Sequence, residues 1–305
     1  MNKNVIIAGG SGLVGKRLTE QLIDKGYDVE WYSRNPKSNA MLKQFKLDYK
    51  TGQIDTSPLE KADFVVNLAG ASLSGSRWTK TFKKEILNSR VETTKLLLES
   101  ISRAIKKPIT YVQASAVGYY GNQASEKIFS EEDGPGGDFL ANVCQEWEKE
   151  GSKFPELPIR RVFLRIGVVF SPGTLAFEKM VLPIKYNLGA PLGSGKQFFP
   201  WIHLNDLASL FIAAIEKESF RGAYNAVAPQ NLTNRDVTQI LAYHYGKKLW
   251  LPNVPSFVLK LAFGEMAQLL LAGSKVSAQK VIGEGFEFNH PSLETEVIGE
   301  RSVNG

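Results

Sequence analysis

The residues with the clearest chemical meaning stand in a glycine-rich turn near the start of the chain. Gly9, Gly12 and Gly15 recur every third residue after the apolar run at 5–8. Where a strand turns into a helix, such glycines let the backbone approach a diphosphate that a Cβ would obstruct. Free N–H groups at the start of the helix then face the phosphates. The turn predicted to bind a dinucleotide consists of Gly9, Gly10, Ser11, Gly12, Leu13, Val14 and Gly15.

A second position predicts which dinucleotide would bind. Sites for NAD usually carry an Asp or Glu at the end of the second strand, where it binds the ribose hydroxyls. Ser33 and Arg34 occupy this place instead, and an arginine can pair with a 2′-phosphate. The sequence therefore favours NADP(H) over NAD(H) as the cofactor. The alternative interpretation is that Arg34 is a solvated surface residue.

Composition limits the other classes of function. The chain has 305 residues, of which 43% are hydrophobic and 22% charged, as in ordinary globular proteins. Its single cysteine excludes an internal disulfide and fits a reducing, cytoplasmic setting. Three scattered histidines predict no metal site. The net charge of +6 is dispersed, so we expect neither nucleic-acid binding nor membrane insertion.

The elements that must position these residues alternate along the first half of the chain. Strand-like segments and helix-like segments follow each other, which is typical of βαβ units and a parallel sheet. The predicted strands lie at 5–8, 28–32, 63–68, 109–114 and 159–164, and the predicted helices at 12–25, 80–105 and 139–154. The predicted fold class is α/β, a Rossmann-type doubly wound parallel sheet.

The second half of the chain loses this rhythm. Loops rich in glycine and proline separate helical segments at 205–217, 233–245 and 255–272. We predict a small C-terminal α+β lobe that binds the substrate. The dinucleotide-binding domain would span residues 1–165, with returning segments at about 201–228, and residues 166–305 would mainly form the lobe.

Several further segments, in order along almost the whole chain, give it a resemblance to a known family. They include Asn67-Leu68-Ala69-Gly70, Arg77-Trp78-Thr79, the run from Ser115 to Gly121, Trp201-Ile202-His203 and Gly264-Glu265-Met266. With the glycine turn, they resemble the extended or atypical short-chain dehydrogenases/reductases. More narrowly, they resemble the epimerase-family proteins of the nucleotide-sugar epimerase/dehydratase group, which carry a short C-terminal domain of unknown function.

This resemblance implies a Rossmann fold with NADP in its cleft, but no particular substrate. It places Leu68, Ala69, Gly70 and Arg90 at the cofactor and Ser115 at the reacting oxygen of a substrate. Lys80, Lys83 and Arg90 would select an anionic substrate if their shared helix face looks into the cleft. A solvated basic face is the alternative. Some relatives of the subgroup are labelled as inhibitors of cell or plastid division.

The catalytic pattern of the superfamily is broken in this chain. Ordinary members pair a Tyr with a Lys four residues later, whose charge lowers the pKa of the phenol. Phe139 and Val143 occupy these two positions. Three accounts stay open: an oxidoreductase with acid/base groups from elsewhere, a cofactor-binding regulatory protein without redox turnover, and a scaffold for a partner. For the first, Ser115 and Tyr119 are the candidate catalytic residues, and Cys144, Arg90, Lys83 and Glu146 are looser ones.

Three residues are predicted to contact the substrate, which we expect to be a small molecule. Tyr120 lies close behind Ser115, while Lys196 and Trp201 belong to a glycine-rich and aromatic segment that the resemblance places over the cleft. Each has a structural alternative, as a core residue or a solvated lysine. His203 is interpreted as a structural residue just before a helix capped by Asn205 or Asp206. A homodimer is left open.

Overall fold

An eight-stranded sheet forms the centre of the computed structural model, which describes residues 2–74, 76–121 and 126–294. Its strand order is β11-β8-β6-β5-β1-β2-β3-β4, and all neighbours are parallel except β3 and β4. The strands are β1 (Asn4–Ala8), β2 (Asp28–Ser33), β3 (Gln44–Asp48), β4 (Gln53–Ile54), β5 (Phe64–Asn67), β6 (Thr110–Ala116), β8 (Arg160–Ile166) and β11 (Gly222–Ala226). The predicted Rossmann-type α/β fold is confirmed.

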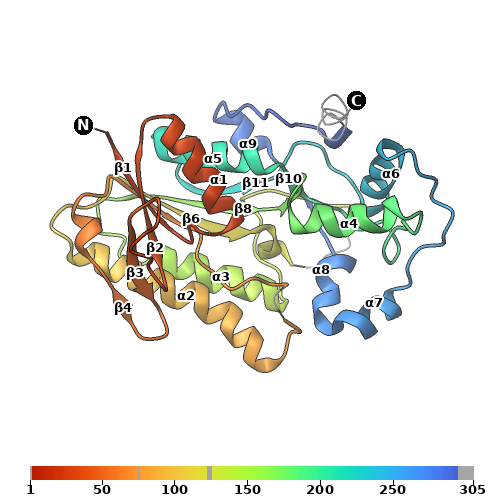
Figure 1. Ribbon diagram of the computed structural model, residues 1–305, viewed down its shortest axis with the longest axis horizontal. Helices are drawn as coiled ribbons and strands as arrows, with labels where there is room; N and C mark the ends of the chain where they lie inside the picture. The colour runs from red at the N-terminus through yellow and green to blue at the C-terminus, as the bar shows by residue number, and fades with distance from the viewer. Residues whose placement is uncertain (1, 75, 122–125, 295–305) are drawn as a thin grey trace.

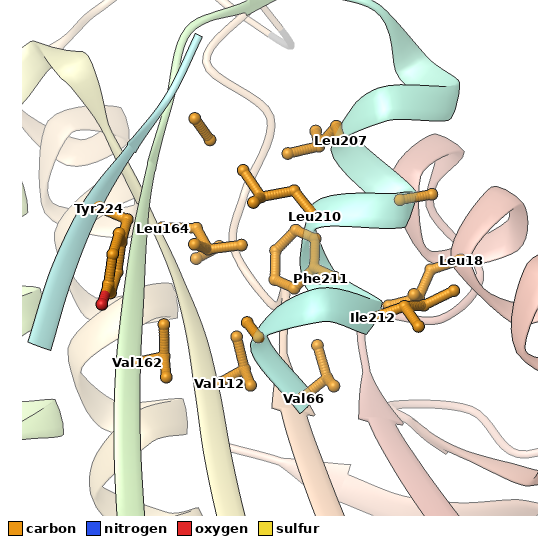
Figure 2. Close-up of a cluster of buried hydrophobic side chains, with 14 of the residues drawn as sticks. Leu18, Val66, Val112, Val162, Leu164, Leu207, Leu210, Phe211, Ile212 and Tyr224 are labelled. Atoms are coloured by element: carbon orange, nitrogen blue, oxygen red, sulfur yellow. The ribbon is translucent and has the colours of Figure 1, made fainter. Parts of the chain in front are cut away.

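Helices cover both faces of this sheet (Figure 1). Those on one face are α1 (Leu13–Asp24) and α5 (Leu204–Glu216), and those on the other are α2 (Lys80–Arg103) and α3 (Phe139–Gly151). Neighbouring strand residues point to opposite sides, so that Ile7 and Val66 pack toward α1 and α5 while Ile6 and Val65 pack toward α2. Figure 2 shows Leu210 and Phe211 of α5 above the strands.

The strand order determines where a ligand can bind. Strands β1 and β5 are neighbours in space, although β2, β3 and β4 lie between them in the sequence. The chain therefore reverses direction across the sheet at β1, and the carboxyl ends of β1, β2 and β5 meet at one edge. Such a switch point is where open α/β sheets bind their ligands.

A separate apolar core holds much of the second half of the chain. It combines α4 (Leu175–Lys185) and α6 (Asn234–His244) with the strand pair β9 (Val168–Val169) and β10 (Trp201–Ile202). A second strand pair joins β7 (Ile128–Phe129) to β12 (Lys275–Val276), and α9 (Gln279–Gly283) lies beside β11. The last predicted lobe residues, 295–305, lie outside the described ranges. None of the described helices is long and apolar enough to cross a bilayer.

The helix predicted at 255–272 is wrong as a single element. The structure instead has α7 (Ser256–Phe263), a 3-10 turn (Gly264–Ala267) and the short α8 (Gln268–Leu271). Gly264 has φ of +60°, a left-handed conformation that ends a right-handed helix and that glycine adopts at little cost. The bend brings this segment toward the start of α2, where Arg77 donates a hydrogen bond to the carbonyl of Ala262 at 3.1 Å.

His203 has the structural role expected from the sequence, although it takes the capping position itself. Its Nδ1 accepts a hydrogen bond from the backbone N–H of Asn205 and caps α5. Asp206 is fully buried, and its carboxylate accepts the backbone N–H groups of Asn289 and His290. The C-terminal segment is thereby fixed to the start of α5.

Candidate functional site

A cleft of about 330 Å³ opens at the carboxyl ends of β1, β2 and β5. Of the residues predicted to contact the cofactor, Gly9, Ser11, Gly12, Ser33, Arg34, Leu68, Ala69 and Gly70 line it. Gly10, Leu13, Val14, Gly15 and Arg90 are not among its lining residues. The first four instead shape the turn and the start of α1, and the contact of Arg90 with the cofactor stays a prediction. The other lining residues are Ala8, Tyr32, Asn35, Leu47, Tyr49, Ala71, Glu85, Ser89 and Thr93.

The glycine turn forms the floor of this cleft. Gly9 has φ of +85°, and a Cβ there would lie 2.9 Å from the carbonyl carbon of Leu68 on β5's exit loop. A Cβ on Gly15 would lie 2.5 Å from the backbone oxygen of Gly9. Both approaches are closer than carbon atoms tolerate, so glycine is required to bring loop, helix and strand together. No side chain caps α1, which leaves its first N–H groups available to a ligand.

The cleft wall beyond β2 carries the predicted cation. Ser33 and Arg34 follow the end of β2 and both line the cleft. Lys46 of β3 donates a hydrogen bond from Nζ to the carbonyl of Arg34 at 2.6 Å and pairs with Asp48 at 3.3 Å. The cation that lines the cleft at this wall is Arg34, and it would favour an anionic group bound next to it.

Sequence reasoning missed the hairpin that completes this wall. Leu47 and Tyr49 come from β3 and the turn after it, and Tyr49 donates a hydrogen bond to Glu85 of α2 at 2.5 Å. This bond and the nearby Lys50 hold the pKa of Glu85 below its usual range. The alternation of Phe45, Leu47 and Tyr49 before a Thr-Gly turn is a hairpin signal that could have revealed the strand.

Hydrogen bonds to two buried side chains hold the loop after β5 in place. Asn67 is fully buried; its side-chain Oδ1 accepts a hydrogen bond from the N–H of Ala69 at 3.1 Å, and its side-chain Nδ2 donates to Thr94 and Tyr111. Ser89 Oγ accepts the N–H of Ala71 at 2.9 Å. These bonds fix a backbone without large side chains against the floor of the cleft.

Ser115, the predicted catalytic serine, is 3% exposed, is not among the lining residues of the cleft, and belongs to a buried charged cluster at the end of β6. Its hydroxyl donates to Oε1 of Glu148 on α3 at 2.6 Å. Arg165 of β8 binds the same carboxylate through two hydrogen bonds of 2.9 and 2.8 Å. Burial alone would lower the pKa of Arg165, but the hydrogen bonds and charge of Glu148 outweigh it and raise the pKa. The arginine is therefore permanently charged and neutralises Glu148.

Tyr119 lies beside this cluster, whereas Tyr120 is built into the core. The guanidinium of Arg165 is 3.5 Å from the ring centroid of the half-buried Tyr119. Tyr120 is fully buried, donates to Asn225 at 2.6 Å and accepts from Arg165 at 3.1 Å. The prediction that Tyr120 contacts the substrate is wrong for this structure, because its hydroxyl is already bonded and its ring is covered.

The two other residues predicted to contact the substrate differ in exposure: Trp201 is buried and Lys196 is exposed. Trp201 is fully buried in the core that contains Phe170, so its ring cannot stack on a substrate and this prediction is wrong. Aromatic residues after a glycine-rich loop were a weak signal because they equally describe a core strand. Lys196 is exposed on its loop, is not among the lining residues of the cleft, and stays an untested prediction.

The residues at the positions of the missing catalytic Tyr and Lys belong to an apolar patch. Val143 is buried with Trp78 and Ile86, and Phe139 packs edge-on against Trp78 with ring centroids 5.5 Å apart. Lys83 lies over the ring of Phe139 at 5.0 Å but pairs with Glu265 of the C-terminal segment. No phenol or free ammonium therefore replaces the usual pair at this place among the described residues.

Two of the looser candidates are excluded as acid/base groups near Ser115. Glu146 lies on the surface of α3 beside Lys149. Cys144 is buried, and this burial raises the pKa of its thiol to about 12. The carboxylate that contacts Ser115 is instead that of Glu148. Glu148 lies four residues after Cys144 and therefore on the same face of the helix. That spacing could have identified Glu148 from the sequence.

We expect Cys144 to resist thiol reagents in the folded protein, because it is covered and its thiolate is rare near neutral pH. Iodoacetamide at pH 8 should leave the native chain unmodified by mass spectrometry and alkylate it in denaturant. A Ser152→Cys variant, with an exposed thiol after the same helix, should react in the native state. Rapid native labelling of Cys144 would show that it is an accessible thiolate.

Comparisons with known proteins show which family the chain matches. Residues 5–226 match the model of the NAD dependent epimerase/dehydratase family, and residues 254–295 match a domain of unknown function, DUF1731. Human epimerase family protein SDR39U1 is 37% identical over 294 residues, which cover 95% of this chain and 96% of the human protein. Epimerase family protein YfhF of Bacillus subtilis is 34% identical over 98% of this chain and 99% of its own.

Solved structures show the same architecture. The crystal structure of human SDR39U1 (isoform 2) with NADPH superposes with a TM-score of 0.87 at 33% identity, covering 98% of this chain and 99% of that one. A nucleoside-diphosphate sugar epimerase from Corynebacterium glutamicum gives 0.78 at 29% identity, covering 98% of this chain and 59% of the other. The first of these holds its NADPH in a protein that matches this chain from end to end.

Proposed function

Because the chain belongs to the NAD-dependent epimerase/dehydratase family, we propose that its cleft binds NADP(H) and that it is an oxidoreductase-like enzyme acting on a small molecule. The observation that carries this proposal is the cleft itself: a helix start without a side-chain cap faces a wall that carries Arg34. The NADPH in the crystal structure of the human relative supports the same cofactor.

The residues present fit a phosphorylated dinucleotide. Ser11 and Leu13 at the start of α1 offer backbone N–H groups to a diphosphate, while the N–H of Gly12 donates to the carbonyl of Gly9 at 3.1 Å. Ser33 and Arg34 would hold the additional 2′-phosphate, and the small Ala69 leaves room for the adenosine ribose. When bound, the nicotinamide would supply a hydride donor or acceptor.

The cluster at Ser115 would orient the substrate oxygen. Glu148 accepts a hydrogen bond from the Ser115 hydroxyl in the structure, so the lone pairs of the serine oxygen stay available to a donor such as a substrate hydroxyl. Arg165 keeps the carboxylate in place with two hydrogen bonds. We propose that Ser115 and the neighbouring Tyr119 are the residues that touch the reacting group, with Glu148 positioning the serine.

The loss of the usual catalytic Tyr and Lys supports a second candidate function. The positions of the usual catalytic Tyr and Lys are filled by Phe139 and Val143 in an apolar patch. A protein that binds NADP(H) without turning it over would need neither group. Under this alternative, the protein is a regulatory module that reports cofactor binding to a partner.

A turnover assay separates the two functions. The wild-type protein is incubated with NADPH and a panel of sugar nucleotides, aldehydes and quinones, and the nicotinamide absorbance is followed. For a substrate that reacts, Ser115→Ala should lower kcat by about a hundredfold, the size of a typical acid/base contribution. The matched control is Ser256→Ala, an exposed serine at the start of α7, which should leave the rate unchanged. Tight NADPH binding without turnover across the panel would contradict the enzyme proposal and favour the regulatory one.

A further inference from the structure

The apolar patch around Phe139 and Val143 is only partly covered. Trp78, Ile86 and Val143 form its buried base. The side chains that pack against this base keep part of their surface exposed; they are Leu73, Phe82, Leu87, Phe139, Leu140 and Met266. Ligand sites for small molecules are lined mainly by apolar and aromatic side chains, so a partly open cluster of this kind is suited to an apolar ligand.

The patch adjoins the turn that carries the candidate catalytic tyrosine. A Cβ on Gly118 would lie 3.4 Å from the Cβ of Leu140, which follows Phe139 at the start of α3. Gly118 is the residue before Tyr119 in the 3-10 turn after β6. A ligand that covers Phe139 and Leu140 would therefore lie beside the turn of Tyr119.

The C-terminal segment closes one side of the patch. It is held at the start of α2 by the hydrogen bond from Arg77 to Ala262 and by an ion pair of Lys83 with Glu265 (Figure 1). Among the described residues, Met266 is its one apolar side chain that packs against the patch. Methionine is unbranched and flexible, so this side of the patch can adapt to apolar ligands of different shape.

The polar groups at the edge of the patch are already bonded to each other or to the backbone. Lys83, a candidate for selecting an anionic substrate, pairs with Glu265 and lies over the ring of Phe139. The indole N–H of Trp78 donates to the carbonyl of Leu73 at 2.9 Å. A sugar diphosphate would lose the hydration of its charges here, and neither Lys83 nor Trp78 is open to replace it.

We propose that this patch binds the hydrocarbon part of an apolar ketone, aldehyde or alcohol, and that such a compound, and not a sugar nucleotide, is the substrate class. The oxygen of the ligand would face Tyr119. Its carbon skeleton would remove apolar surface of Phe139 and Met266 from water, which is the main source of affinity for such ligands. Its role as a substrate rests on the proposed oxidoreductase function, whereas its binding does not.

Calorimetric titrations of the full-length chain with defined ligands test this site. The probes are 2-acetonaphthone and 2-undecanone, an aromatic and an aliphatic ketone, with UDP-glucose as the polar comparison. Each is added to protein saturated with NADP⁺, so that no ketone is reduced during the titration. We expect a ketone to bind about tenfold more tightly than UDP-glucose, with the negative heat-capacity change that marks apolar burial.

Variants on two sides of the patch locate the binding. Phe139→Ser removes the ring and should weaken ketone binding about tenfold. Met266→Gln keeps the length of the side chain, replaces its thioether with an amide, and should weaken the binding several-fold. Ile105→Ser is the control, since it makes polar a residue that is 94% exposed just after the other end of α2, and it should leave the affinity unchanged. If circular dichroism shows that Phe139→Ser does not fold, Met266→Gln decides the outcome.

The proposal is overturned if neither ketone binds, if UDP-glucose binds as tightly as the ketones, or if the patch variants bind the ketones as Ile105→Ser does. Failure of the proposed function looks different. The wild-type protein would then bind no NADP(H), or would bind a ketone and NADPH without reducing the ketone. In the first case, the same titrations without cofactor still decide whether the patch binds an apolar ligand.

Discussion

Replacing Arg34 with aspartate should reverse the cofactor preference of the cleft from NADP(H) to NAD(H). Arg34 lines the wall after β2, at the place where NAD-binding folds carry an acidic residue for the ribose hydroxyls. The variant loses charge-assisted hydrogen bonds to the 2′-phosphate and gains a repulsive charge. Such bonds contribute about 1.5–3 kcal/mol each, so NADPH affinity should fall by about a hundredfold. Affinity for NADH should rise, because the new carboxylate can accept both ribose hydroxyls.

The fluorescence of the reduced nicotinamide measures both affinities in the same assay. Lys37→Asp is a matched control, since it makes the same charge change on an exposed residue three positions later. It should leave the ratio of the two affinities within about twofold, as expected for a screened surface charge. A ratio that Arg34→Asp leaves unchanged would mean that the 2′-phosphate binds elsewhere or that the arginine is only a solvated residue.

Replacing Arg165 with leucine should destabilise the folded protein by about 3–5 kcal/mol. The ion pair that it forms with Glu148 is almost dry, with side chains that are 5% and 13% exposed. Removing the guanidinium leaves the carboxylate in the interior with Ser115 as its remaining hydrogen-bond donor. Urea unfolding at neutral pH, followed by circular dichroism, measures the change in the free energy of unfolding.

Two further variants show whether the buried charge causes this loss. The double variant Arg165→Leu/Glu148→Leu removes both charges and should recover most of the stability, because the unpaired carboxylate is gone. Lys149→Leu breaks the surface pair with Glu146, in which the side chains are 73% and 44% exposed, and should cost less than about 1 kcal/mol. An Arg165→Leu variant that is no less stable than Lys149→Leu would refute this account of the cluster.

The sequence predicted the features that depend on neighbouring residues. The glycine turn could be located because Gly9, Gly12 and Gly15 act within one strand–turn–helix unit, and their close contacts lie there or on the adjacent β5 loop. The alternation of strands and helices likewise predicted the layered sheet. Arg34 was found because the end of β2 has a fixed place in this unit, and it does line the cleft.

The features that depend on residues far apart in the chain escaped prediction. The pairing of Ser115 with Glu148 and Arg165 joins β6, α3 and β8, and only the folded sheet brings these elements together. Trp201 could not be assigned to core or cleft because an aromatic residue suits both. Strand β3 was missed although the alternation of its apolar residues was visible in the sequence. Tyr49, in the turn after β3, and its hydrogen bond to Glu85 were therefore missed as well.

The central claim is that the glycine turn and Arg34 together form a site for a phosphorylated dinucleotide. Isothermal titration calorimetry of the folded, full-length chain with NADPH and with NADH tests it most directly. We predict one NADPH site per chain, with an affinity at least tenfold higher than that for NADH because only NADPH carries the 2′-phosphate. No heat of binding with either dinucleotide would contradict the claim.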